Sequence, residues 1–331
     1  MNLKKLVFLL TLVSLLTLSG CSNMDNAYNK AAEKSFQVNV LEGTAALGML
    51  KMMAPEITPN PRLGDTVQYV LEKNQDELYS KLQKGEVEIA AVPTEMAARL
   101  FNENNMYKLA AVNTKGFIYV LANNTQLLSW NSLKGCEVNL AVEGSVEDII
   151  FRYLTAKNGL DPDKDITIKY ADSQEALYKM TIDGSSKITV LSEPWASMAA
   201  KNSGNKIMLD LQEEWTRIKG GEYPMVQTSV VVKKEAASAK AEPLDLFLKD
   251  YADSLAWVNK NPLEAARLLD NHPVGVSKDL AQETIKRSNF VYISAKDAEA
   301  AVEKYLQVLL ESSPEIIGGK LPGKDFYSIG N

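Results

Sequence analysis

The sequence has few of the residues that build redox, metal or nucleic-acid sites. Its 331 residues contain two cysteines and one histidine, so no Cys/His cluster offers metal ligands. Acidic residues outnumber basic ones by 42 to 36, and this excess argues against nucleic acid as a partner. After residue 20, no apolar run is long enough to span a bilayer. We therefore predict no metal and no cofactor, and we assign no role to Cys136, which we expect to be a small buried thiol.

The N-terminus has the pattern of a bacterial lipoprotein signal. Lys4 and Lys5 precede an apolar run over 6–18, which is short for a transmembrane helix. The following Leu18-Ser19-Gly20-Cys21 resembles a lipobox, which implies that Cys21 is lipidated and becomes the mature N-terminus. The alternative is an ordinary secretory signal with an incidental cysteine. We predict a signal peptide over 1–20, a polar tether over 21–34, and a lipid-anchored, extracytoplasmic protein in the periplasm or at the cell surface.

One strand-to-helix turn occurs twice. The apolar run 138–142 ends at Glu143, where Gly144 permits a tight turn and Ser145 is a natural N-cap. The same pattern ends at Gly43 and Thr44, about 100 residues earlier. A second repeated unit, 88–98 and 187–196, follows at nearly the same spacing. Two such turns in each half predict two similar α/β lobes whose strand ends face one cleft.

We predict the fold class to be α/β, with each lobe a mainly parallel sheet flanked by helices. Lobe 1 is expected over 35–122 plus 229–331, and lobe 2 over 123–228. The first crossing is placed at Asn123-Asn124, and a β-rich return over 223–232 gives the second. Helices opening near Pro243, Pro262, Ser277 and Ser294 are expected to pack on lobe 1. Two crossings make a hinge, so cleft closure is expected.

Several motifs resemble the solute-binding proteins of ABC importers, closest to the group that binds sulfonates, nitrate, taurine and thiamine precursors. They are the lipobox, Glu42-Gly43-Thr44, the segment 133–138, Gly144-Ser145, the segments 153–162 and 165–166, Leu191-Ser192-Glu193-Pro194-Trp195-Ala196, Asn261-Pro262 and Phe326-Tyr327. Together they cover most of the chain after the signal. The resemblance implies a two-lobed type II periplasmic-binding-protein fold, a small-molecule ligand, a partner permease with its ATPase, and no catalysis.

The turns and the resemblance together select candidate ligand-binding residues. Backbone N–H groups at 44, 45, 145 and 146 are expected to bind an anionic or carbonyl oxygen. Trp195 is either an aromatic wall or a core residue, and Glu193 is either a ligand contact or a helix-start charge. The candidates are Thr44, Ala45, Thr94, Thr114, Ser145, Val146, Glu193, Trp195, Gln227 and Thr228.

These turns carry no Arg or Lys. Glu193 would also oppose a strongly anionic ligand, so the sequence leaves room for a neutral or cationic heterocycle. The ligand itself stays open among sulfonate, nitrate, a thiamine precursor and another heterocycle.

Two other function classes stay open beside a monomeric binding protein. One is an extracytoplasmic enzyme on the same fold, which would need His272 to reach the cleft. The other is a scaffolding lipoprotein, whose mark would be a large exposed apolar patch.

Overall fold

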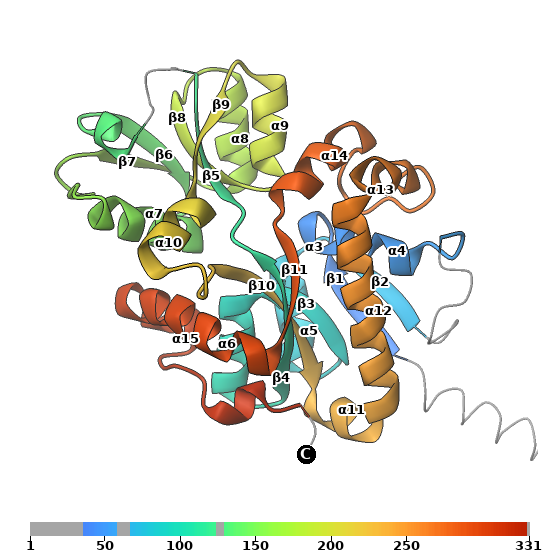
Figure 1. Ribbon diagram of the computed structural model, residues 1–331. Helices are drawn as coiled ribbons and strands as arrows, with labels where there is room; N and C mark the ends of the chain where they lie inside the picture. Colours follow the sequence, from blue (N-terminus) through green and yellow to red (C-terminus); the bar gives the residue numbers. More distant parts are fainter. Residues whose placement is uncertain (1–35, 58–66, 124–128, 330–331) are drawn as a thin grey trace, which may run out of the picture.

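The computed structural model describes residues 36–57, 67–123 and 129–329 (Figure 1). The predicted signal peptide, the lipidation site Cys21 and the tether lie outside the described residues. Within them, no helix is both long enough and apolar enough to cross a membrane.

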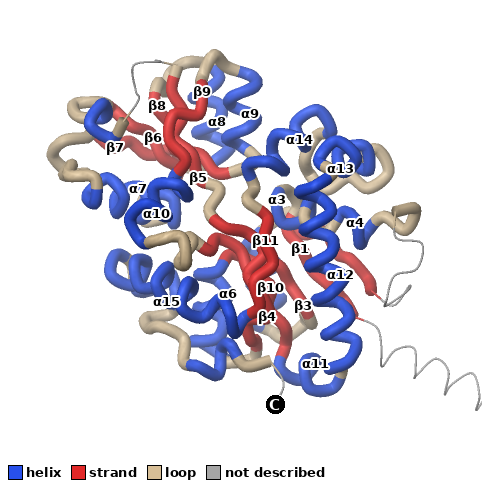
Figure 2. The backbone as a smooth tube through the Cα atoms, viewed as in Figure 1, coloured by secondary structure: helices blue, strands red, loops and turns tan. Residues whose placement is uncertain are grey.

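Two mixed sheets form two lobes, as Figure 2 shows in red. In the first sheet the order is β11-β4-β10-β3-β1-β2, and in the second it is β7-β6-β8-β5-β9. The first sheet comprises β1 (Phe36–Leu41), β2 (Val67–Glu72), β3 (Ile89–Pro93), β4 (Tyr107–Lys115), β10 (Val226–Lys233) and β11 (Phe290–Ser294). The second comprises β5 (Ile118–Ala122), β6 (Glu137–Ala141), β7 (Thr167–Ala171), β8 (Ile188–Ser192) and β9 (Lys206–Asp210).

The internal repeat predicted from the two glycine turns is present in the sheets. Strand β1 pairs in parallel with β2 and β3, and β6 pairs in parallel with β7 and β8. The remaining pairs are antiparallel, with β10 beside β3 and β5 beside β8. The two-lobed α/β fold is therefore confirmed, but the sheets are mixed where mainly parallel sheets were predicted. The difference arises because β5 and β10, the first strand after each crossing, and the edge strand β11 run opposite to their neighbours.

Helices cover both faces of each sheet (Figure 1). Those of the first lobe are α3 (Thr44–Leu47), α4 (Leu50–Met53), α5 (Gln75–Gln83), α6 (Thr94–Asn104), α11 (Lys234–Ala239), α12 (Ala241–Lys260), α13 (Pro262–Leu268), α14 (Lys278–Arg287) and α15 (Ala295–Ser312), with the 3₁₀ turns η3 (Pro314–Ile317) and η4 (Lys324–Tyr327). Those of the second are α7 (Val146–Lys157), α8 (Gln174–Ile182), α9 (Trp195–Asn202) and α10 (Leu211–Lys219), with η2 (Trp130–Leu133).

The chain crosses between the lobes earlier than predicted. Strand β4 lies in the first sheet and β5 in the second, so the first crossing is at Gly116 and Phe117 and not at Asn123-Asn124. The error arose because β5 is apolar and fully buried, like a strand of either lobe. The second crossing spans 220–225, between α10 and β10, a few residues before the predicted return to lobe 1 at 229.

Side-chain hydrogen bonds hold the first crossing in place. The Gly116 N–H donates to Gln212 Oε1 at 2.8 Å, and Asn289 Nδ2 donates to the Gly116 carbonyl at 2.6 Å. The Phe117 N–H donates to Gln227 Oε1 at 2.9 Å. A Cβ added at Gly116 would lie 1.9 Å from Met225 Cε, so any larger residue requires the buried Met225 side chain to move. The two connections are thus packed against each other as one unit.

The C-terminal helices pack on the first lobe, as predicted, and two of them also touch the second. Helix α15 contacts β4 and α6 on one side and α7 on the other. Trp215 of α10 meets Tyr305 of α15 edge to face, with ring centroids 6.0 Å apart. As a result, one hydrophobic cluster runs without interruption from the α6–α15 side of the first lobe into the α7–α10 side of the second.

Candidate ligand-binding site

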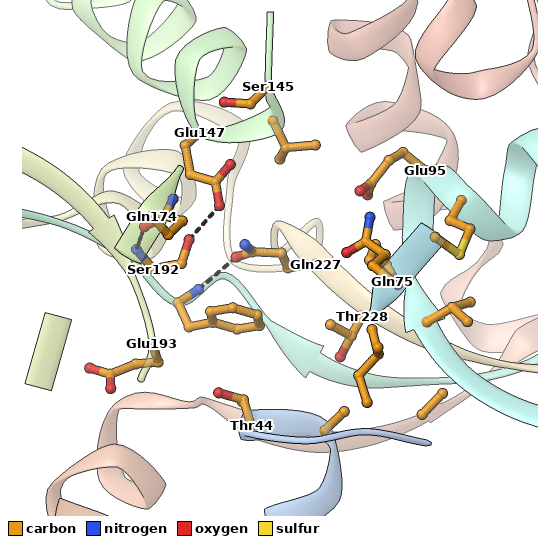
Figure 3. A pocket seen from close by; sticks show the side chains of 18 of the residues that line it. Thr44, Gln75, Glu95, Ser145, Glu147, Gln174, Ser192, Glu193, Gln227 and Thr228 are labelled. Atoms are coloured by element: carbon orange, nitrogen blue, oxygen red, sulfur yellow. Dashed lines mark hydrogen bonds between the residues drawn. The ribbon is translucent and has the colours of Figure 1, made fainter. Parts of the chain in front are cut away.

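A cavity of about 470 Å³ lies between the lobes (Figure 3). We call it the interlobe cavity. Its wall includes the carboxyl ends of β1, β3 and β8 and the first turns of α5, α6 and α7. In mixed α/β sheets the carboxyl ends of parallel strands leave exposed turns, where ligands ordinarily bind. The cavity therefore lies where the paired turns in the sequence predicted it.

Eight of the ten predicted residues line the interlobe cavity. Thr94 and Thr114 do not: both are fully buried beneath it, where Thr94 Oγ1 lies 2.8 Å from Ser229 Oγ and Thr114 Oγ1 lies 2.6 Å from Thr228 Oγ1. The Thr94 hydroxyl joins the first residue of α6 to β10, and the Thr114 hydroxyl joins β4 to β10. The eight that line the cavity are Thr44, Ala45, Ser145, Val146, Glu193, Trp195, Gln227 and Thr228.

At the first turn, Thr44 presents a free hydroxyl. Gly43 has φ of +103°, and its N–H donates to the Val274 carbonyl at 2.7 Å. Thr44 is 6% exposed, and its Oγ1 has no hydrogen-bond partner. A buried hydroxyl without a partner costs roughly 1–3 kcal/mol, and because Thr44 lines the cavity, a water or a ligand there can complete it.

In the turn before α7, a backbone N–H group is already hydrogen-bonded to a carboxylate of that helix. Ser145 caps α7, and the Gly144 N–H donates to Asp148 Oδ2 at 2.9 Å. The Ser145 N–H donates to the Val142 carbonyl at 3.2 Å. The Ser145 N–H, predicted to bind an anionic or carbonyl oxygen of a ligand, is therefore used within the turn in this structure. The Asp148 carboxylate is buried and paired with Arg152 Nε at 2.8 Å.

Glu193 is linked to the first lobe through Ser197. It is 4% exposed and accepts a hydrogen bond from Ser197 Oγ at 2.9 Å. Ser197 Oγ in turn accepts from Arg287 Nη1 of α14 at 2.9 Å. Burial raises the pKa of Glu193 to about 7, and Ser197 and Arg287 partly offset that effect. Figure 3 shows its carboxylate turned away from the other labelled side chains, which favours a structural role at the lobe interface.

Trp195 belongs to the cavity wall. It is half-buried at the start of α9, and its ring lies 5.5 Å from that of Tyr178. Trp195 thus lines the cavity and also packs against a neighbouring aromatic ring, which combines features of the two alternatives predicted for it. Phe117 and Tyr79 are further aromatic residues of the wall, so a flat solute can find ring contacts there.

Sequence reasoning missed several polar groups of the cavity. Glu95 and Glu147 each occupy the second position of a helix that follows a predicted strand end, a signal that was present in the sequence. Gln75 and Tyr79 were not detectable, because β2 and α5 must first pack beside β1. Arg99 was missed because it lies in the second turn of α6, away from the strand end. The missed polar residues are Glu42, Gln75, Asp76, Tyr79, Glu95, Arg99, Glu147, Gln174 and Ser192.

The histidine and the cysteine that an enzyme on this fold could use do not line the interlobe cavity. His272 Nε2 lies 2.9 Å from Glu56 Oε1, and His272 does not line the interlobe cavity. Cys136 is half-buried and its thiol faces the Ser132 carbonyl at 3.4 Å. Among the described residues, no three His, Cys, Asp or Glu side chains are grouped closely enough to hold a metal ion.

Comparisons with known proteins agree with this architecture. The sequence profile of the NMT1-like family matches residues 43–269. An ABC transporter protein of Parabacteroides distasonis is 24% identical with a TM-score of 0.76, covering 89% of this chain and 99% of that one. The periplasmic aliphatic sulphonate-binding protein of Escherichia coli is 13% identical with a TM-score of 0.69, covering 90% and 92%. The periplasmic nitrate-binding protein of Synechocystis is 13% identical with a TM-score of 0.60, covering 89% and 87%. No curated protein matches the sequence.

Proposed function

The chain belongs to the NMT1-like family, and from that premise we propose that it is the solute-binding component of an ABC-type importer. In this proposal it captures a small organic molecule between its lobes and carries out no reaction. The observation that supports it most is the interlobe cavity, whose polar wall is contributed by both lobes. Fold neighbours with transporter and binding-protein names point in the same direction.

Two thin connections support a closing motion. Only Gly116–Phe117 and residues 220–225 join the described sheets along the chain, and both are short. Domain closure about such connections buries a ligand and lets each lobe supply part of the site. The lobe contact through Ser197 and Arg287 is polar, whereas the contact of α10 and α7 with α15 is hydrophobic, so we propose that closure pivots about the α15 side.

We propose further that Cys21 carries a lipid after removal of residues 1–20. Residues 21–34 then tether the binding domain to the membrane, where it delivers solute to a permease and ATPase. Metabolic labelling with a fatty-acid analogue tests this part separately: we expect label on the wild type and none on the Cys21→Ala variant. Equal labelling of both would contradict the anchor without touching the binding proposal.

A thermal-shift screen of the full-length chain in mild detergent tests the binding proposal. A solute that binds only the folded state adds to the free energy of unfolding by mass action, by about 2.7 kcal/mol when its concentration is 100 times its Kd. The melting temperature of the protein rises accordingly. We expect a narrow set of small organic solutes to stabilise the protein. If none of several hundred nutrients does so, the proposed function is wrong.

A further inference from the structure

The wall of the interlobe cavity is strongly acidic. Arg99 is the cationic side chain among the described residues that line it. It is already paired, since its Nε donates to Glu103 Oε1 at 2.8 Å and its guanidinium lies over the Tyr79 ring. Five acidic side chains line the same cavity: Glu42, Asp76, Glu95, Glu147 and Glu193. Burial raises the pKa values of Glu95 and Glu193, so the negative charge of the wall rests mainly on Glu42, Asp76 and Glu147. An anionic solute would therefore meet net repulsion, in keeping with the shortage of basic residues at the turns.

Two of these carboxylates come from opposite lobes and face each other across the cavity. Glu95 stands in the first turn of α6, and Glu147 stands in the first turn of α7. Figure 3 shows both side chains directed into the space between the lobes. Glu147 Oε1 accepts from Ser192 Oγ at 2.6 Å, which fixes its position. Glu95 Oε2 is shielded from solvent and has no hydrogen-bond partner.

An unpartnered carboxylate oxygen beside a second carboxylate needs a positive charge or a proton. Burial and the neighbouring Glu147 raise the pKa of Glu95 to about 8. The Glu95 carboxyl of the ligand-free protein is therefore protonated at neutral pH. A cationic donor group placed between the two acids would serve both at once. Charge-assisted hydrogen bonds of this kind are about twice as strong as neutral ones.

Other polar atoms of the same cavity that lack a hydrogen-bond partner indicate which further groups the solute carries. Gln174 Nε2 is a buried donor without a partner, and Thr44 Oγ1 is a buried hydroxyl without a partner. A solute that satisfies Gln174 must carry a hydrogen-bond acceptor besides its cationic group. The aromatic walls at Phe117 and Trp195 add a preference for a flat body.

We infer that the interlobe cavity takes a small organic cation whose charged nitrogen group lies between Glu95 of the first lobe and Glu147 of the second. The inference rests on the proposed function and adds the class of solute to it. Because each lobe supplies one carboxylate, the cation attracts both lobes, and ligand charge becomes part of what holds the cleft closed. Amidines, protonated amines and protonated heterocycles have this chemistry.

The test uses the full-length chain in mild detergent and a panel of charge-matched solutes. Each set contains a cation, a neutral analogue and an anion of similar size, such as benzamidine, benzamide and benzoate, alongside cationic, neutral and anionic nutrients. Thermal shift identifies the solutes that bind, and calorimetry measures their Kd. We expect the tightest solutes to be cationic. Glu95→Gln and Glu147→Gln are each expected to weaken them by about 10- to 100-fold.

Glu264→Gln is the matched control, because it removes the same charge from an exposed side chain of α13 outside the cavity wall. We expect it to leave Kd within about twofold. Melting curves of each variant without solute confirm that it folds, and Glu95→Gln is nearly isosteric with the protonated acid.

The possible results separate the two proposals. Binding confined to neutral or anionic solutes would overturn the inference and leave the proposed function standing. So would cation binding that both glutamine variants retain. Tightest binding of an inorganic cation such as Mg²⁺ or Zn²⁺ would replace the organic cation with a metal and overturn the inference as well. The absence of any binding would overturn the proposed function itself.

Discussion

Arg287 at the end of α14 donates through Nη1 to Ser197 Oγ of α9 at 2.9 Å, across the boundary between the lobes. Ser197 passes the interaction on by donating to Glu193 Oε1. The carbonyl of Arg287 also accepts from the Tyr119 hydroxyl at 2.6 Å. One residue of the first lobe thus contacts two elements of the second, beside the interlobe cavity.

Replacing Ser197 by alanine is expected to weaken this contact. Ser197 is buried, and the variant leaves Arg287 and the Glu193 carboxyl without their shared partner, so we expect a loss of about 1–2 kcal/mol in the free energy of unfolding. Urea denaturation of both proteins measures it. Ser185→Ala, at an exposed position of the same lobe, serves as the control and is expected to change little. Equal losses in the two variants would contradict the interlobe role.

The first crossing is expected to be sensitive to a single methyl group. Gly116→Ala places a Cβ 1.9 Å from Met225 Cε and 3.0 Å from Gln212 Oε1. Overpacking of this kind costs about 1–3 kcal/mol, because the buried Met225 side chain must move and Gln212 Oε1 is crowded.

Chemical denaturation of Gly116→Ala beside Gly221→Ala checks this expectation. Gly221 lies in the second crossing, and an added Cβ there has open space. We expect only the first variant to be destabilised. A Gly116→Ala protein as stable as the wild type would show that the crossings are loosely packed.

The Thr44 hydroxyl is expected to strengthen solute binding while lowering the stability of the ligand-free protein. Thr44→Val removes a buried hydroxyl without a partner, so the melting temperature of the ligand-free protein should stay the same or rise. The same change should weaken a stabilising solute by about tenfold, or 1.4 kcal/mol. Thr114→Val is the contrasting control, since its hydroxyl is bonded to Thr228 and its loss should lower stability. Unchanged solute affinity in Thr44→Val would exclude Thr44 from the site.

Glu95 gives a pH dependence with a defined sign. Its pKa is about 8 in the folded protein, against an ordinary value near 4.5. Below pH 4.5 both folded and unfolded states hold the proton. As the pH rises toward 8 the unfolded chain ionises first, so Glu95 lowers the free energy of unfolding over this window.

Glu95→Gln removes this contribution. The glutamine variant should match the wild type near pH 5 and become the more stable of the two by pH 9, in the absence of solute. Melting temperatures across this range measure the difference, and comparison with wild type cancels the parallel effects of Glu193 and Asp210, whose pKa values are also raised by burial. Parallel curves at all pH values would contradict the buried environment assigned to Glu95.

Much of the architecture was predictable from local patterns. The turns at Gly43 and Gly144 reveal the two repeated units, and the N-caps Ser145 and Ser294 mark helix starts that the structure confirms. Strand β11 was missed, because its five residues form an edge strand only after β4 provides a partner.

The site was less predictable than the fold. Position at a strand end identified Thr44 and Glu193, but it could not tell that Thr94 points into the sheet. It also could not tell that Asp148 fills the turn before α7, because that contact depends on the side-chain geometry of one helical turn. Glu95 and Glu147 come to face each other across the cavity only when the two lobes pack together, so local sequence patterns could not place them as a pair.

The central claim is that solute binds between the lobes. The most direct measurement is a crystal structure of the protein grown with a solute that stabilises it in the thermal-shift screen. We predict density in the interlobe cavity, in contact with Thr44 and Glu95 of the first lobe and with Glu147 or Gln174 of the second. Density at another surface, or in contact with one lobe alone, would contradict the account.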